Sequence, residues 1–321
     1  MATTFKTLLP GDVIDTRNRL HESIPITGTI VSGTYGPQGQ ERNIKDYSHG
    51  LFQSVFDYPF LSSSANHIFD ITLGYDEQSG YSGSANRVMQ KKKINMYNQF
   101  AQLLLGYTGS TSDGIRKFES DLVLDGAGAM KEVFFVNFSR LLTKDQIKKG
   151  TFSIELGTHH WTASMSATKT LTDANASDTG GTTNTLGGDY GLLLDSADKA
   201  RGVVFYQAGI AVLTASVLQG LIRDDGAVAL NGTGNNFDSL LSGSTIQTIA
   251  TAVRQRIQNV QFNNTTELNS TIYFCRANHN EFNYSSNPTY INKSKIRVKS
   301  IASDEPVSYI TSVGLYNNNN E

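Results

Sequence analysis

Hydrophobic and polar residues alternate with a period of two along much of the chain, which predicts a series of short β-strands. The clearest runs combine β-branched and aromatic residues and are bounded by Gly, Asn, Asp or Pro. They lie at 24–31, 67–73, 132–138, 151–156, 202–213, 270–276, 295–301 and 307–316. Within 202–213, the pair Ala208-Gly209 predicts either two strands or one strand that bends there.

Two other segments follow the 3.6-residue period of an amphipathic helix. The first covers 85–105, with Ser84 as its cap and Gly106 just past its end. The second follows the capping-box sequence 244–247 and has apolar residues three or four positions apart: Ile246, Ile249, Ala250, Val253, Ile257 and Val260. Shorter helices are expected in the aromatic-rich stretch 46–60 and at 143–149, where Thr143 and Gln146 have capping-box spacing.

These elements predict an α+β fold with mainly antiparallel β-sheets, two long amphipathic helices and two domains. Strands and helices do not alternate regularly, so a doubly wound parallel sheet is not expected. We expect an extended N-terminal arm at 1–20, for which an ordinary first strand and loop is the alternative. The rest divides into an α+β domain at 21–158, a polar excursion or loop at 159–190, and a second α+β domain at 191–321.

Composition narrows the classes of partner and compartment. The 321 residues are 38% hydrophobic and only 17% charged, which suits a β-rich protein whose surfaces become interfaces in a large assembly. The net charge of −2 gives no reason to expect nucleic acid or an acidic membrane surface as a partner. No run of about 18 apolar residues predicts a membrane span, and the N-terminus lacks the apolar core of a signal peptide. We therefore expect a protein made and kept in a cytoplasm.

Patterns that carry catalytic or metal chemistry are weak. The neighbours His159 and His160 face opposite ways on a strand, so they cannot easily share a metal ion. Cys275 and His279 have ligand-like spacing only on a helix, and we expect Cys275 to be a buried thiol. The run Lys91-Lys92-Lys93 is expected on a solvated helix face rather than at a phosphate site.

A calcium loop is only partly matched. Asp173, Asn175, Ser177 and Asp178 resemble the start of an EF-hand loop. Asp178, however, stands at the position of the turn glycine, and the twelfth position is Asn184 instead of Glu. We therefore expect no catalytic residue, no cofactor and no metal, and a chain that is not an enzyme.

Three aromatic residues stand in the polar segment 278–292, namely Phe282, Tyr284 and Tyr290. A disordered linker would be poor in aromatic residues. We expect these rings to pack against the chain's own core or against another chain, and they are our candidate interface residues.

Several stretches carry a resemblance to a known group of proteins. They are Ile24-Pro-Ile-Thr-Gly-Thr29, Gln53-Ser-Val-Phe-Asp-Tyr-Pro59, Tyr273-Phe-Cys-Arg276, His279-Asn-Glu-Phe-Asn-Tyr-Ser-Ser-Asn-Pro-Thr-Tyr290 and Pro306-Val-Ser-Tyr-Ile-Thr-Ser-Val-Gly-Leu-Tyr-Asn317. In these stretches the chain resembles virion structural proteins of marine T4-like phages, notably cyanophages. The resemblance implies a tail baseplate subunit of the wedge type that acts through fixed protein–protein interfaces. Other tail and baseplate proteins and copies of the chain itself are its implied partners. Its implied location is the virion tail, and the host cytoplasm during assembly.

Two alternatives stay open: a tail-associated protein that binds or cleaves carbohydrate, against which the single Trp argues, and a capsid or neck component. At the end of the sequence, the asparagines 317–320 follow the expected strand 307–316. They are either a frayed terminus or a turn toward a further strand in a longer natural chain. The resemblance favours the longer chain. Without that further strand, 307–316 would leave an open edge for a neighbouring subunit.

Overall fold

The computed structural model describes residues 7–26, 42–82, 87–107, 114–125, 127–157, 168–176, 186–218, 241–276, 287–292, 295–296, 313–317 and 319. The chain forms two compact units. Unit 1 consists of Met1–Arg17 and Asn269–Glu321, and unit 2 consists of Asn18–Leu268. Two long strands, β1 and β12, contribute residues to both units.

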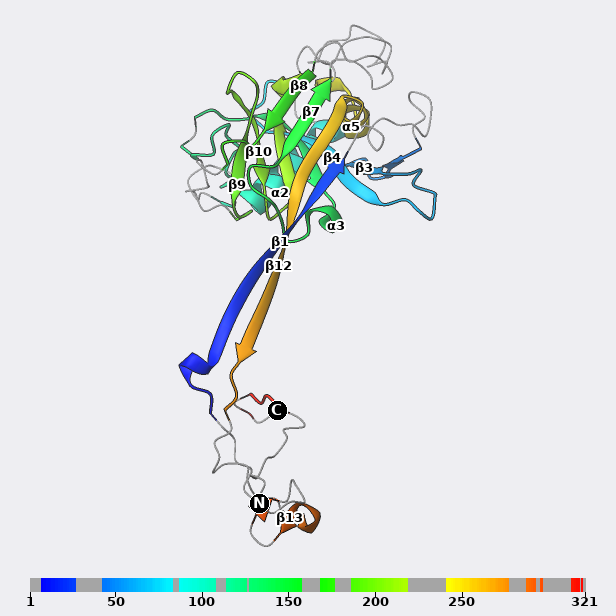
Figure 1. Cartoon of the computed structure of the whole chain (residues 1–321). Helices are drawn as coiled ribbons and strands as arrows, with labels where there is room; N and C mark the ends of the chain where they lie inside the picture. Colours follow the sequence, from blue (N-terminus) through cyan, green and yellow to red (C-terminus); the bar gives the residue numbers. More distant parts are fainter. Residues whose placement is uncertain are drawn as a thin grey trace. The chain divides into compact units, whose positions relative to one another are not determined.

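A twelve-stranded sheet is the main feature of the described residues (Figure 1). Its strand order is β1-β12-β7-β8-β9-β10-β11-β5-β4-β3-β2, and β6 also pairs with β12. Every strand pair with a defined register is antiparallel. The strands are β1 (Val13–Ile26), β2 (Ile44–Asp46), β3 (Gln53–Phe56), β4 (His67–Tyr75), β5 (Glu132–Phe138), β6 (Gln146–Ile147), β7 (Ser153–Gly157), β8 (Thr168–Thr172), β9 (Tyr190–Leu194), β10 (Ala200–Phe205), β11 (Ile210–Thr214) and β12 (Ile257–Tyr273). This confirms the expected mainly antiparallel α+β class.

In unit 2 the sheet packs against itself. Its two halves meet at β8 and β9, which pair through a single residue pair, Thr172 and Leu194. The Phe138 ring of β5 lies 5.7 Å from that of Phe152, which precedes β7, and 5.3 Å from that of Phe262 in β12. Both β7 and β12 are far from β5 in the sheet order. The two halves therefore enclose one hydrophobic core, to which Phe134, Val136 and Phe138 of β5 contribute.

The opposite face of β5 and its neighbours is covered by helix α2 (Val88–Leu104). Phe135 and Val133 face this second core, and Phe100 of α2 stacks on Phe135 with ring centroids 4.1 Å apart. The helix approaches the sheet closely at Gly74, where an added Cβ would lie 2.6 Å from the Tyr97 backbone nitrogen. Because both faces of β5 are buried, the sequence of this central strand is hydrophobic almost throughout.

Several predicted elements are confirmed. Strand 132–138 has the bounds of β5, and 202–213 forms the two strands β10 and β11, joined by Gly209 at a φ of 69°. Helix 85–105 corresponds to α2, and Gly106 adopts a left-handed φ of 80° just past its end. The proposed cap Ser84 lies outside the described residues, and Arg87 occupies the N-cap position.

The second long helix is shorter than predicted. Helix α5 covers Ile246–Arg254, capped by the Thr245 hydroxyl, which accepts a hydrogen bond from Thr248 N at 3.1 Å. Ile257 and Val260 belong to β12 instead. A register shift lies between Ile257 and Asn259, and because of it the side chains of Ile257 and Val260 both face the core. This bulge reproduces the three-residue spacing of a helix within a strand, which is why the periodicity misleads.

The two shorter predicted helices are wrong. The stretch 46–60 contains β3, whose Val55 is buried in the sheet core. At 143–149, helix α3 (Arg140–Thr143) ends where a start was expected, because Ser139 caps it and Lys144 adopts a φ of 54°. Gln146 then begins β6.

The range 159–190, expected as a polar excursion, contains β8 in its described part. Leu171 of this strand is fully buried in the core of unit 2. A single large apolar side chain among threonines was too weak a pattern to predict the strand.

The described residues of unit 1 include the ends of β1 and β12, four short elements and the C-terminal residues 313–317 and 319. The short elements are η1 (Pro10–Asp12), η3 (Pro288–Tyr290) and the two-residue pair β13 (Ile291–Asn292) and β14 (Lys295–Ile296). Of the predicted strand 307–316, the described residues 313–316 form no strand, and Val313, Leu315 and Tyr316 are exposed. No helix in the described ranges is both long and apolar enough to cross a membrane.

Candidate functional site

The predicted interface residues fall largely outside the description. Phe282 and Tyr284 lie outside the described residues, and Tyr290 is described only as the last backbone position of η3. The structure thus leaves their interface role a prediction. The candidate site is instead the neighbouring segment of unit 1, where β1 and β12 pair.

In unit 1 the two strands form a two-stranded ribbon of Val13–Arg17 and Asn269–Tyr273 (Figure 1). Hydrogen bonds define which residues stand opposite each other. The Thr16 hydroxyl bonds to Ser270 Oγ at 2.6 Å, and the Thr271 hydroxyl donates to Asp15 Oδ1 at 2.7 Å. Phe274 N donates to the Asp12 carbonyl at 2.8 Å. These contacts place Ile14 directly opposite Ile272 in an antiparallel pair.

The two faces of this ribbon differ in chemistry. Alternation puts Ile14, Thr16, Ser270 and Ile272 on one side, and we call these four residues the ribbon face. The face carries no charge, and its two isoleucines are 45% and 46% exposed. Two β-branched apolar side chains thus stand side by side in solvent, where an exposed strand position would ordinarily be polar.

Asp15 and Arg17 lie on the other face, whereas Asp12, at the end of the ribbon, lies by the same alternation on the side of Ile14. Asp15 accepts from Thr271, and at the ribbon's end Asp12 accepts from Arg276 Nη2 at 2.7 Å and from Leu9 N at 3.1 Å. The ribbon is thereby closed by η1 and held in register by polar contacts.

The same alternation continues in the part of β1 and β12 that belongs to unit 2. Arg19 Nε donates to Glu267 Oε1 at 3.1 Å, and His21 Nδ1 lies 3.1 Å from the Thr265 hydroxyl. Leu20 and Leu268 lie there on the same side as Ile14 and Ile272, and both are exposed. Period-two alternation in 14–20 and 266–272 could have revealed this pattern from the sequence, but polar residues dilute it.

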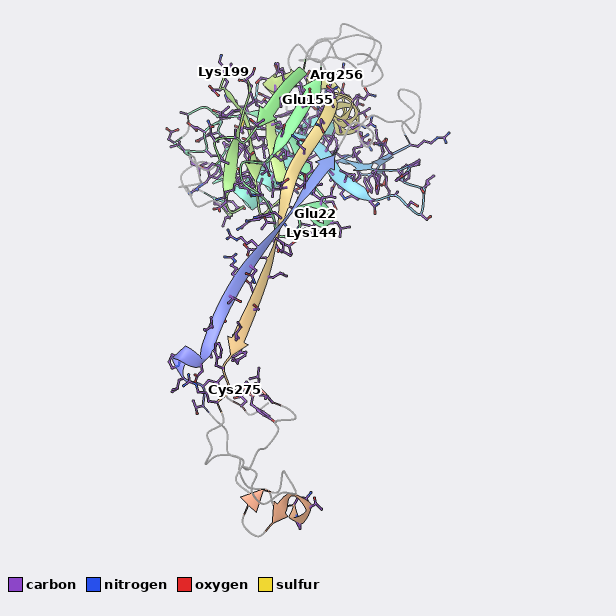
Figure 2. All side chains as sticks on the ribbon, in the orientation of Figure 1. Glu22, Lys144, Glu155, Lys199, Arg256 and Cys275 are labelled. Atoms are coloured by element: carbon purple, nitrogen blue, oxygen red, sulfur yellow. The ribbon has the colours of Figure 1, made fainter. Side chains whose placement is uncertain are left out.

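Cys275 follows the ribbon in unit 1 and is exposed (Figure 2). The expectation of a buried thiol is therefore wrong. The prediction assumed that a strand rich in aromatic and β-branched residues is buried. Beyond Glu267, however, all residues of β12 are exposed.

A pocket of about 300 Å³ lies in unit 2 between α2 and the sheet. Its residues are Phe52, Asp70, Thr72, Met96, Gln99, Phe100, Leu103, Phe135 and Asn137. Asp70 Oδ1 accepts from the Ser54 hydroxyl at 2.5 Å and lies 2.8 Å from His67 Nε2. The serine and the histidine thus both contact the same carboxylate oxygen, which is not the serine–histidine contact of a nucleophilic triad.

A buried polar cluster in unit 2 involves Asp173. Its Oδ1 accepts from Phe152 N at 2.8 Å, and its Oδ2 accepts from Gly150 N at 2.8 Å and from the Tyr206 hydroxyl at 2.9 Å. Burial raises the pKa of the Asp173 carboxyl, and burial next to Asp173 raises the pKa of Tyr206. Asp173 is 1% exposed and its carboxylate accepts hydrogen bonds from protein donors. Ser177, Asp178 and Asn184 of the partly matched calcium loop lie outside the described residues.

Lys93 corrects the expectation of a solvated three-lysine face. Its side chain is 0% exposed, and Nζ donates to the Leu241 carbonyl at 2.5 Å and lies 5.6 Å from the Tyr75 ring centroid. Burial lowers the pKa of the Lys93 ammonium to about 8. Lys91, two positions earlier, is exposed. The helical period carries Lys93 to the covered side of α2.

The described residues contain no group of three or more His, Cys, Asp or Glu side chains arranged to hold a metal ion. His159, His160 and His279, named as weak candidates, lie outside the described ranges. Compared with protein-family models, with curated proteins and with solved structures, the chain matches none of them. The fold and the candidate site therefore define a mainly antiparallel β protein with an amphipathic two-stranded ribbon.

Proposed function

We propose that the chain is a structural subunit of a phage virion, a tail baseplate component that acts through fixed protein–protein interfaces. The observation that carries the proposal is the ribbon face, because it presents paired isoleucines to solvent, and neither isoleucine belongs to a hydrophobic core of the described residues. The resemblance to virion proteins of marine T4-like phages supports the same class. Other tail and baseplate proteins and further copies of the chain are the proposed partners.

An isolated two-stranded ribbon is at best marginally stable in water, and a third strand or a packed face is needed for independent stability. In unit 1, Val13–Arg17 and Asn269–Tyr273 have polar cross-strand contacts on one face but exposed isoleucines on the other. A neighbouring subunit that covers these isoleucines would remove apolar surface from water and order the ribbon.

Location is the decisive test of the proposed function. Gold-labelled antibody against the purified chain would be applied to particles produced from the genome that encodes it. Label at the tail baseplate is expected. Label confined to the capsid or neck, or no label on intact or disrupted particles, would overturn the baseplate proposal.

The role of the ribbon face is tested in the same particles with the double variant Ile14→Asp/Ile272→Asp. Two carboxylates on the ribbon face would have to be desolvated in an interface, so we expect at least a tenfold loss of incorporation into particles. Asn269→Asp adds a carboxylate to the opposite ribbon face and should be incorporated normally. Equal incorporation of both variants would show that the ribbon face is not the interface.

The pocket in unit 2 favours a second candidate function, that of a tail-associated carbohydrate-binding protein. Phe52 and Phe100 supply apolar surface, and Asp70, Gln99 and Asn137 supply the acceptors and donors that sugar hydroxyls use. Titration with a panel of neutral mono- and disaccharides, followed by NMR, would test it. Shifts confined to pocket residues and lost in Asn137→Ala would support this candidate, and no shifts at millimolar sugar would remove it.

A further inference from the structure

We infer that the pocket between α2 and the sheet binds a monosaccharide that carries a protonated amine. The inference rests on the second candidate function, carbohydrate binding, and names the class of sugar. The residues that carry it are Asp70 on β4, Asn137 on β5 and Gln99 on α2, all of which belong to unit 2.

Asp70 has one carboxylate oxygen available for a ligand. Its Oδ1 accepts from the Ser54 hydroxyl and contacts His67 Nε2, whereas no residue in the described part of the chain donates to Oδ2. His67 brings a positive charge to this carboxylate only when it is protonated, and no lysine or arginine is among the described residues that line the pocket. The charge of the pocket therefore favours a cationic ligand group and opposes a phosphate or a carboxylate.

Two side-chain amides line the same pocket. Asn137 stands directly opposite Asp70 in the register of β4 and β5, so the two side chains are neighbours on the sheet face that α2 covers. Gln99 lines the pocket from α2. Within the described ranges, neither amide forms a side-chain hydrogen bond. Because an amide both donates and accepts, the pair suits the hydroxyl groups of a sugar, which do the same.

The apolar residues and the volume of the pocket limit the size of the ligand. Phe52 and Phe100 are half-buried and line the pocket, where their rings offer flat apolar surface to one side of a sugar ring. The volume of about 300 Å³ lies at the lower end of the range of roughly 300–1,000 Å³ for small-molecule sites. The pocket is therefore suited to a single sugar ring.

Titration of the ¹⁵N-labelled chain, followed by NMR, compares glucosamine with glucose, which has a hydroxyl group in place of the ammonium. Near neutral pH we expect shifts at the residues that line the pocket. The dissociation constant for glucosamine should be at least about fivefold lower than that for glucose, because a hydrogen bond between charged groups is stronger than a neutral one. N-Acetylglucosamine, whose amide carries no charge, should show no such preference over glucose.

Two substitutions separate the ammonium from the hydroxyl groups. Asp70→Asn should bring the ratio of the two dissociation constants to about one, whereas Asn137→Ala should weaken the binding of both sugars. Asp198→Asn removes a negative charge from an exposed turn that does not line the pocket, and it should keep the wild-type ratio. If Asp70→Asn does not fold, the exposed position Gln99 replaces it, since Gln99→Glu should raise the preference for glucosamine and Gln99→Lys should lower it.

Equal affinity for glucosamine and glucose, or a preference that Asp70→Asn retains, would overturn the inference and leave carbohydrate binding in place. Glucosamine binding that Asn137→Ala does not weaken would also overturn it, because the pocket would then bind a cation without using hydroxyl groups. Absence of shifts with every sugar would remove both the inference and the carbohydrate-binding candidate. Antibody label at the tail baseplate would in that case still support the structural role.

Discussion

The sheet core of unit 2 and the ribbon of unit 1 are built by the same rule and differ in what covers them. Both are antiparallel, and in both the side chains alternate between two faces. In unit 2, Phe138 and Phe135 on opposite faces of β5 are each buried in a separate core. In unit 1, Ile14 and Ile272 occupy equivalent strand positions and remain exposed. Alternation thus defines an apolar face, but it does not specify whether the same chain or another one covers it.

The largest difference between the two regions is expected from one substitution made in each. Phe138→Ala should lower the free energy of unfolding by about 3–5 kcal/mol, because it leaves a cavity between Phe152 and Phe262. Phe274→Ala in unit 1 should change it by less than about 0.5 kcal/mol, because that ring is 47% exposed. Urea denaturation of both variants measures the two changes in the free energy of unfolding. Comparable losses would mean that the unit 1 segment is packed as a core.

Lysines at two positions of α2 should differ in their pH dependence. Because the folded-state pKa of Lys93 lies near 8 and the unfolded value near 10.5, the unfolded state binds more protons between these values. The free energy of unfolding of the wild type should therefore rise relative to Lys93→Met as pH increases from 8 to 10.5. At about 1.4 kcal/mol per pKa unit, the gain is about 2–3 kcal/mol. Lys91→Met is the exposed control and should give parallel curves. Parallel curves for Lys93→Met as well would contradict a buried ammonium.

Added methyl groups provide a third contrast. Gly74→Ala should lower the free energy of unfolding by about 1–3 kcal/mol, because the new Cβ would collide with the Tyr97 backbone where α2 meets the sheet. Gly11→Ala in unit 1 has no atom within 4 Å of the new Cβ and should be neutral or slightly stabilising. Thermal unfolding distinguishes them, and a neutral Gly74→Ala would show that α2 does not approach β4 this closely.

The smallest expected contrast concerns one hydrogen bond in each region. Tyr206→Phe removes a donor from the buried Asp173 carboxylate and should cost about 1–3 kcal/mol. Thr271→Val removes the bond to Asp15 on the exposed ribbon, where water replaces it, and should cost less than about 0.5 kcal/mol. Chemical denaturation measures both losses, and a larger loss for Thr271→Val would indicate that the side of the ribbon opposite the ribbon face is buried.

Sequence patterns predicted β4, β5, β7, β10 and β11, because these strands bury regular runs of residues, but not β2, β3, β6, β8 or β9. Strand 132–138 and the pair of strands about Gly209 follow directly from such runs. Periodicity misled where the backbone is irregular. The bulge at Ile257–Asn259 imitates a helix, and the left-handed Lys144 ends one where a capping box suggested a start. No residue type at either position predicts its irregularity from the sequence.

The candidate site was less predictable for a different reason. Phe282, Tyr284 and Tyr290 attracted attention as rings in a polar segment, whereas the ribbon face consists of two isoleucines, a threonine and a serine. No one of these residue types indicates an interface. Their significance comes from the pairing of β1 with β12, residues that lie more than 250 positions apart in the chain. Lys93 was similarly hidden, since only the packing of α2 distinguishes it from Lys91.

Hydrogen–deuterium exchange of the backbone amides of Val13–Arg17 and Asn269–Tyr273 tests most directly whether the ribbon depends on a neighbouring subunit. An uncovered two-stranded ribbon should exchange at least a hundredfold faster in dilute purified chain than β5 does. The same amides should become protected when the chain is assembled in particles, while those of β5 stay unchanged. Protection of the ribbon equal to that of β5 in dilute chain, with no change on assembly, would contradict the proposal that the ribbon face is an interface.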